Sequence, residues 1–336
     1  MPIMNSRSSP ASSSQQIACL RYTVPSILVI VMAFAIFEIV AFDLKDIGIQ
    51  ITEFLASSNS TSLVSQINES NARIKWGTIS LLYLFASICL LVISINTLRQ
   101  FLTRRPLWIF VGTAIFLAFV WLGYLVYGLS RNEPVSMIFM FTFNTLTMSG
   151  RFEAGQLDSI QAVIDSINIF ATVIPVVGVI ASCSTLVPCV SQGKEGAYYY
   201  ANQMRYLKGL MNTGSVMLLV GILHMSIWLR WPSALLGDAK LLVEDINKFS
   251  LAVSTFWGVA FTLLIAAYYI PAARTLNRRA KAALADVYDD PVELRGWLQE
   301  NNLEMTTASQ IREIVTISGP LLAGSLSTSL LGISAM

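Results

Sequence analysis

The stretch LMNTGSVMLLVGILHMSIWL, residues 210–229, decides the fold, because it is almost uninterruptedly apolar and yet contains the single histidine of the protein, His224. About 20 helical residues, rising roughly 1.5 Å each, cross a hydrocarbon core of about 30 Å. Five other stretches share this length and character, and they are residues 23–44, 77–98, 107–129, 167–190 and 249–270. We therefore predict an all-α integral membrane protein, a bundle of six transmembrane helices with a small helical cytoplasmic C-terminal tail.

The composition agrees with a membrane protein. Of the 336 residues 54% are hydrophobic and 12% are charged, whereas about 25% charged residues is usual in a soluble domain. The apolar residues are gathered into blocks, so we expect the lipid bilayer to surround them. A net charge of +2 with no dense Lys/Arg patch argues against a nucleic-acid partner. The four cysteines form no CxxC pair and no zinc-type spacing, so we expect no metal site.

Three parts follow from this pattern. Residues 1–22 are expected to be a disordered cytoplasmic tail, residues 23–271 a six-span transmembrane domain, and residues 272–336 a cytoplasmic amphipathic helical tail. Lys and Arg gather after the second, fourth and sixth spans, and this bias predicts that both termini are cytoplasmic. Short loops favour a bacterial inner (plasma) membrane.

The C-terminal tail carries its own helix signals. The basic stretch 272–287 is expected to continue the sixth span, and Asp290 followed by Pro291 is typical of an N-cap and a first-turn proline. A second helix is predicted at 307–317. The apolar stretch 320–333, interrupted by Gly and Ser, is expected to dock against the cytoplasmic side of the bundle or the lipid surface. A cytoplasmic protein partner would then bind through residues 290–336.

Charged and titratable residues inside spans are costly and therefore indicate function. Glu38 in the first span and His224 in the fifth are expected at about the same depth, so they could form a titrating pair of the kind used in proton relays. The alternative is structural: Glu38 extends towards the outer surface, and His224 binds a neighbouring carbonyl.

The stretch 134–150 is apolar but too short to cross the membrane. It ends in Asn144, Thr145, Thr147, Ser149 and Gly150, whose backbone carbonyls could line a re-entrant filter. The alternative is a surface helix followed by a turn.

Two further features concern helix packing. Ser254, Gly258, Thr262 and Ala266 recur every four residues and predict a flat ridge on which another helix can lie closely, either within the bundle or in a homo-oligomer. Pro175 lies inside the fourth span and is a candidate hinge.

The sequence lacks HExxH, GxSxG, GxxxxGK[ST] and CxxC, so we expect neither catalytic residues nor a cofactor. The favoured function is a non-catalytic multi-pass membrane protein, a sensor, scaffold or accessory subunit acting through its tail. The alternative is a small-solute or ion transporter or channel that uses Glu38 and His224.

Overall fold

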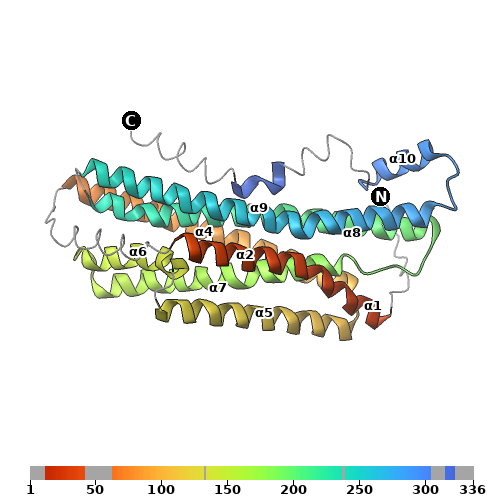
Figure 1. Ribbon diagram of the computed structural model, residues 1–336, viewed down its shortest axis with the longest axis horizontal. Helices are drawn as coiled ribbons and strands as arrows, with labels where there is room; N and C mark the ends of the chain where they lie inside the picture. Colours follow the sequence, from red (N-terminus) through yellow and green to blue (C-terminus); the bar gives the residue numbers. More distant parts are fainter. Residues whose placement is uncertain (1–11, 42–62, 132–133, 237–238, 304–314, 322–336) are drawn as a thin grey trace.

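A computed structural model shows a bundle of long helices (Figure 1). It describes residues 12–41, 63–131, 134–236, 239–303 and 315–321. Six of the described helical segments are long and apolar enough to cross a membrane, and each contains most of one predicted span. The six-helix expectation is therefore confirmed at this level, and the protein has the architecture of a multi-pass membrane protein.

The helices follow one another along the chain with these bounds: α1 (Ser13–Ala18), the 3₁₀ helix η1 (Cys19–Thr23), α2 (Val24–Val40), α4 (Leu63–Phe101), α5 (Arg104–Arg131), α6 (Pro134–Met148), α7 (Ala154–Ser184), α8 (Gly193–Arg230), the 3₁₀ helix η2 (Trp231–Leu235), α9 (Lys240–Leu284) and α10 (Pro291–Glu300). In Figure 1, α8 and α9 run side by side along the bundle, and α6 and α10 lie at opposite ends. We call these ends the α6 end and the α10 end.

Several helices are longer than the spans they contain. Helix α4 begins at Leu63 and helix α8 at Gly193, well before the predicted spans 77–98 and 210–229. The extension of α8 is helical because it buries one apolar face, with Ala197, Met204 and Leu207 each at most 2% exposed. Helix α9 offers the facing row, Ala273, Leu276, Ala280 and Leu284, all 0% exposed. Spacings of three and four residues are those of helix pairs packed as in coiled coils.

The fourth span ends earlier than expected. Helix α7 stops at Ser184, and the chain to residue 192 is not a continuous helix, although the sequence predicted a span to 190. The carbonyl groups freed at this point are bound by side chains from elsewhere in the bundle. Gln203 Nε2 donates to the Val187 carbonyl at 2.7 Å, and Arg279 Nη1 donates to the Leu186 carbonyl. The first three residues of the connection, 185–187, are therefore buried and bonded to the bundle, whereas Val190 is 64% exposed.

The tail is attached to the bundle. Asp290 caps α10 as predicted, since its Oδ1 accepts from the Val292 amide at 2.8 Å. Trp297 and Leu298 of α10 are buried, and Trp297 makes an edge contact with Tyr198 of α8. Of the predicted 307–317 helix, residues 307–314 lie outside the described residues, as do residues 322–333 of the last apolar stretch. Residues 315–321 are described, and they contact α8 and α9.

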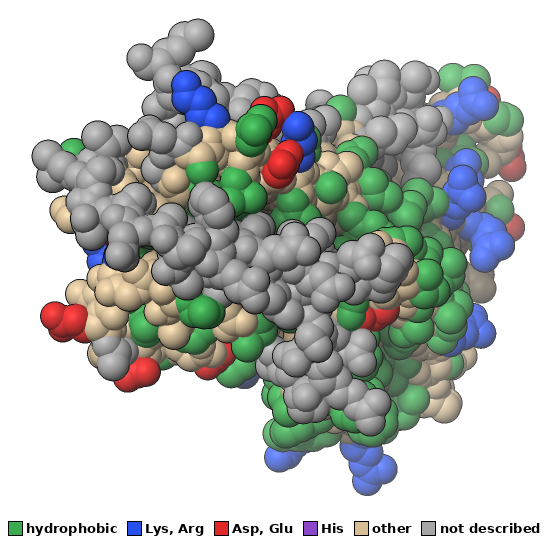
Figure 2. Space-filling model, turned by 60° about the vertical axis from the view of Figure 1, so that its left-hand side comes forward, with side chains coloured by type: hydrophobic (Ala, Val, Ile, Leu, Met, Phe, Trp, Pro, Cys, Tyr) green, Lys and Arg blue, Asp and Glu red, His purple; other side chains and the backbone are tan. Residues whose placement is uncertain are grey.

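Large apolar side chains cover the flank of the bundle. Trp108, Phe116 and Phe119 of α5 are 65–70% exposed, and Leu81 and Phe85 of α4 are similar. Figure 2 shows hydrophobic side chains gathered over the right-hand half of the face in view, with Lys and Arg along its right-hand edge. An apolar surface of this extent is typical of contact with lipid.

Candidate functional site

A half-open cavity of about 570 Å³ is lined by residues of α2, α5, α6, α7, α8 and α9 and by Tyr83 of α4. Its wall is mostly aliphatic and aromatic. The polar residues on the wall include Ser26 of α2, Asn168 and Thr172 of α7, and His224 of α8. Pro175, the predicted hinge, also lies on this wall, inside α7.

His224 belongs to an aromatic cluster near the α6 end. Its side chain is 4% exposed, and its Nε2 accepts a hydrogen bond from Trp76 Nε1 of α4 at 3.0 Å. An indole N–H can only donate, so Nε2 is unprotonated and the neutral ring carries its proton on Nδ1. The ring of Tyr83 is stacked with the imidazole, with 6.1 Å between centroids. His224 thus joins two helices and contributes to the cavity wall.

Glu38 lies at the end of α2 and is bound to α6. Its Oε1 accepts from the backbone amide of Val135 at 3.2 Å, in the first turn of α6. A carboxylate at a helix N-terminus binds an N–H group that has no partner within the helix, and its charge is favoured by the helix dipole. Glu38 and His224 therefore have different partners, and the structure does not bring them together as a titrating pair.

The separation of Glu38 and His224 has a measurable consequence. Glu38→Gln and His224→Gln should be additive, with a coupling free energy below about 0.5 kcal/mol, because Glu38 binds α6 through Val135 while His224 binds α4 through Trp76. A double-mutant cycle of equilibrium unfolding in detergent micelles measures this coupling. A coupling free energy above about 1 kcal/mol would support the hypothesis that Glu38 and His224 form a titrating pair.

The candidate re-entrant stretch is a helix for most of its length. Helix α6 buries Ile138, Phe141 and Leu146, and the hydroxyl groups of Thr145 and Thr147 donate to carbonyls one turn back, at 2.7 and 2.9 Å. Asn144 is part of the same helix. Ser149 and Gly150 form the turn that follows, where Gly150 has φ 63° and Ser149 Oγ donates to the Leu146 carbonyl. Residues 134–148 thus form a helix that packs into the bundle, and the re-entrant filter stays a prediction.

The small-residue ridge of α9 is used within the chain. Ser254 and Gly258 are buried, whereas Thr262 and Ala266 are partly exposed. A Cβ on Gly258 would lie 2.8 Å from the Pro320 carbonyl oxygen and 3.1 Å from the Leu321 Cα. The C-terminal segment, which we define as residues 315–321, therefore occupies this ridge at its glycine.

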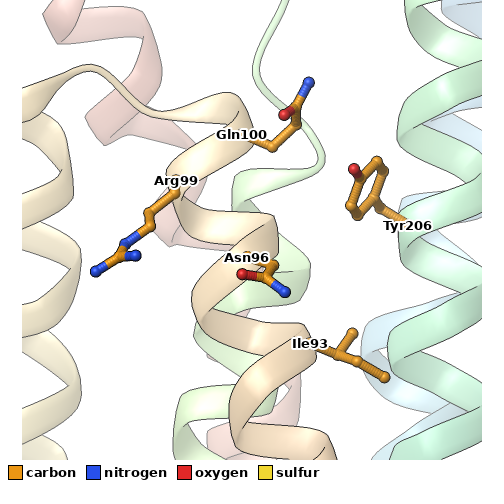
Figure 3. Close-up of a pocket in the computed structure, with 5 residues that line it drawn as sticks. All are labelled: Ile93, Asn96, Arg99, Gln100 and Tyr206. Atoms are coloured by element: carbon orange, nitrogen blue, oxygen red, sulfur yellow. The ribbon is translucent and has the colours of Figure 1, made fainter.

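A smaller hollow of about 430 Å³ lies between α4 and α8 towards the α10 end and is half open. Figure 3 shows the side chains of Asn96, Gln100 and Tyr206 around this space, while Arg99 extends away from Tyr206. It is polar where the main cavity is apolar. No charged side chain in Figure 3 points into it, so it offers little to bind an ion.

Sequence reasoning singled out His224, Pro175 and Gly258 but missed the cavity that connects the first two. Nothing in the sequence singled out Trp76 or Trp257. Trp76 lies one residue before the predicted span 77–98, and Trp257 is one apolar residue among many in the span 249–270. Comparisons with protein-family models, with curated proteins and with solved structures find no match to this chain.

Proposed function

We propose that this protein is a non-catalytic, multi-pass membrane sensor whose tail responds to the packing of the spanning helices. The proposal is carried by the contact between the C-terminal segment and Gly258. Gly258 lies near the middle of the apolar stretch 249–270, so the segment contacts α9 within the predicted sixth span.

Besides its contact with Gly258 of α9, the C-terminal segment also contacts α8. Ser215 Oγ of α8 donates to the Thr316 carbonyl, and Ile317 is 8% exposed and belongs to the main apolar core. Gly319 lies against α8, where a Cβ would be 3.2 Å from Ser215 Oγ. Because the segment contacts both α8 and α9, a shift of one helix against the other would disturb the docking of the segment. The tail is therefore placed to respond to such a shift.

The rest of the tail is fastened at the α10 end. Lys208 Nζ donates to the Asn302 carbonyl at 3.3 Å, and Asn277 Nδ2 donates to the Leu303 carbonyl. Because Trp297 and Leu298 are packed inward, their apolar surface is hidden while α10 is docked. We propose that release of the tail exposes this surface to a cytoplasmic partner. The cytoplasmic placement follows from the Lys/Arg bias of the flanking stretches.

The test uses Gly258→Leu in a cysteine-free background with Ile317→Cys. A side chain at position 258 collides with backbone atoms of Pro320 and Leu321, which cannot rotate away, so we expect the segment to leave the ridge. The rate of alkylation by a maleimide at position 317 should rise about tenfold or more, as for a loss of about 1.4 kcal/mol in docking. The matched control is Gly112→Leu on α5, because a Cβ there meets no atom within 4 Å.

A second measurement separates sensing from simple docking. Vesicles of short-chain and long-chain phosphatidylcholine impose different tilts on spanning helices. The alkylation rate at position 317 should differ between these vesicles in the otherwise native chain, and the difference should vanish in Gly258→Leu. Equal rates in both vesicles would refute the sensor, even if Gly258→Leu releases the segment.

A further inference from the structure

The cavity between α2, α5 and α7 has a lateral opening. Ile27 and Val31 of α2 and Val120 and Tyr124 of α5 line the cavity, and they are also 37%, 52%, 55% and 38% exposed. Residues that both line a cavity and are exposed mark the place where its wall meets the outside. The outer faces of α2 and α5 carry large apolar side chains, so the opening faces lipid.

The cavity has the length and width of an extended hydrocarbon chain. Its lining runs from Thr23, the last residue of η1, to Ala35 of α2, and from Ile167 to Ile180 on α7. At about 1.5 Å per residue these stretches are roughly 18–20 Å long and follow the helices. A volume of about 570 Å³ is within the range of about 300–1,000 Å³ usual for ligand sites. A narrow, apolar space of this length fits a hydrocarbon chain that lies along the bundle.

One polar group on the wall suggests how such a chain is held. Ser26 is 2% exposed, and within the described part of the chain its Oγ has no hydrogen-bond partner. A hydroxyl in a helix can bond a carbonyl one turn back, as Thr172 Oγ1 does to the Asn168 carbonyl at 2.7 Å. A buried hydroxyl without a partner is unfavourable, so an acceptor supplied by a ligand would stabilise it.

We propose that the cavity holds one acyl chain of a bilayer phospholipid, which enters between α2 and α5 and accepts a hydrogen bond from Ser26 at its ester carbonyl. Ser26 lies in the first turn of α2, near the edge of the apolar span, where ester groups of a lipid lie. The chain extends from there towards Phe34 and Trp257, whose rings contact each other across the cavity at 4.7 Å between centroids. This inference does not depend on the tail acting as a sensor.

The experiment uses the full-length protein in vesicles that contain phosphatidylcholine with a photoreactive diazirine on one acyl chain. After illumination, labelled residues are mapped by peptide mass spectrometry. We expect labels on Thr172 and Ile180, which line the cavity but are 4% and 1% exposed and so cannot touch the surrounding lipid. Labels confined to exposed residues of α2, α5 and α7 would overturn the proposal.

Substitutions on the cavity wall, with one matched control outside it, sharpen this test. Ala171 lines the cavity and is exposed, so Ala171→Phe places a large side chain at the opening and should lower labelling of Thr172 and Ile180 about tenfold. Ile169→Phe, on the same helix but outside the cavity, should leave this labelling unchanged. If Ala171→Phe does not fold, Ala35→Phe obstructs the opening from α2. Ser26→Ala should lower labelling roughly two- to tenfold, the effect of one hydrogen bond. Unchanged labelling in the variant that obstructs the opening, or labelling by a free fatty-acid diazirine alone, would exclude the phospholipid chain.

Discussion

Trp228→Ala is expected to lower the free energy of unfolding by roughly 3–5 kcal/mol, the cost typical of removing a large aromatic side chain from a core. Trp228 of α8 is 1% exposed, and its ring lies 5.7 Å from that of Trp76 and 5.8 Å from that of Trp231, between centroids. Its Nε1 donates to the Phe139 carbonyl of α6 at 3.3 Å. One side chain therefore joins α4, α6, α8 and η2, and its loss leaves a hole among all four.

The matched control for this prediction is Trp108→Ala. Trp108 has the same side chain but is 66% exposed on α5, so its removal should change stability by no more than about 0.5 kcal/mol. Equilibrium unfolding in mixed micelles of increasing dodecyl sulfate, followed by circular dichroism, measures both. Equal losses for the two variants would show that the cluster is not a packing centre.

A third variant divides the effect into parts. Trp228→Phe keeps an aromatic ring but removes the N–H, so the Phe139 carbonyl loses this donor. We expect a loss of about 1–3 kcal/mol, smaller than that of Trp228→Ala. If Trp228→Phe cost as much as Trp228→Ala, the hydrogen bond to α6 would dominate, and the ring packing would contribute little.

The spans were predictable because hydropathy is a local property. A run of about 20 apolar residues can be recognised as a membrane span without knowing which helices pack against it. The helical extensions were not predictable from the sequence. Ala197 and Leu207 are apolar residues within a polar stretch, and their role in packing is evident only when Ala273 and Leu276 of α9 lie opposite them. The cap at Asp290 was predicted for the opposite reason, since capping depends on adjacent residues alone.

The candidate site was predicted in its parts but not in its arrangement. Depth along a span can be counted from the sequence, and the counts for Glu38 and His224 were similar. The rotation of each helix about its own axis cannot be derived from the sequence in this way. This rotation determines that Glu38 binds the α6 amide while His224 binds Trp76. The cavity is formed where several helices fail to fill a space, so no single stretch of sequence carries its signal. The small-residue ridge at Gly258 was predicted from the sequence, but the segment that packs on it lies some 60 residues further along the chain.

Gly196→Ala and Gly209→Ala are expected to change stability in opposite directions, although both replace a glycine in α8. A Cβ at position 196 would lie 2.2 Å from the Ser191 carbonyl oxygen and 3.7 Å from the Ala283 Cβ. The nearer contact is to backbone, so relief requires the connection between α7 and α8 to move. At position 209 a Cβ meets no atom within 4 Å.

The magnitudes follow from two competing effects. Alanine is favoured over glycine inside a helix by roughly 0.5–1 kcal/mol, so Gly209→Ala should raise the free energy of unfolding by about that amount. At position 196 the same gain is outweighed by a collision, whose typical cost of about 1–3 kcal/mol is a lower bound for so short a contact. The move would also disturb the carbonyls of Leu186 and Val187, which Arg279 and Gln203 bind nearby.

The same micelle titration measures both glycine variants. A stabilising Gly196→Ala would mean that the connection between α7 and α8 yields easily, and that its side-chain hydrogen bonds do not fix its position. A destabilising result, with Gly209→Ala stabilising, would establish that this connection is a rigid part of the bundle. In that case the α10 end is a firm base from which the tail departs, and movements that reach the tail must come from the contact at Gly258.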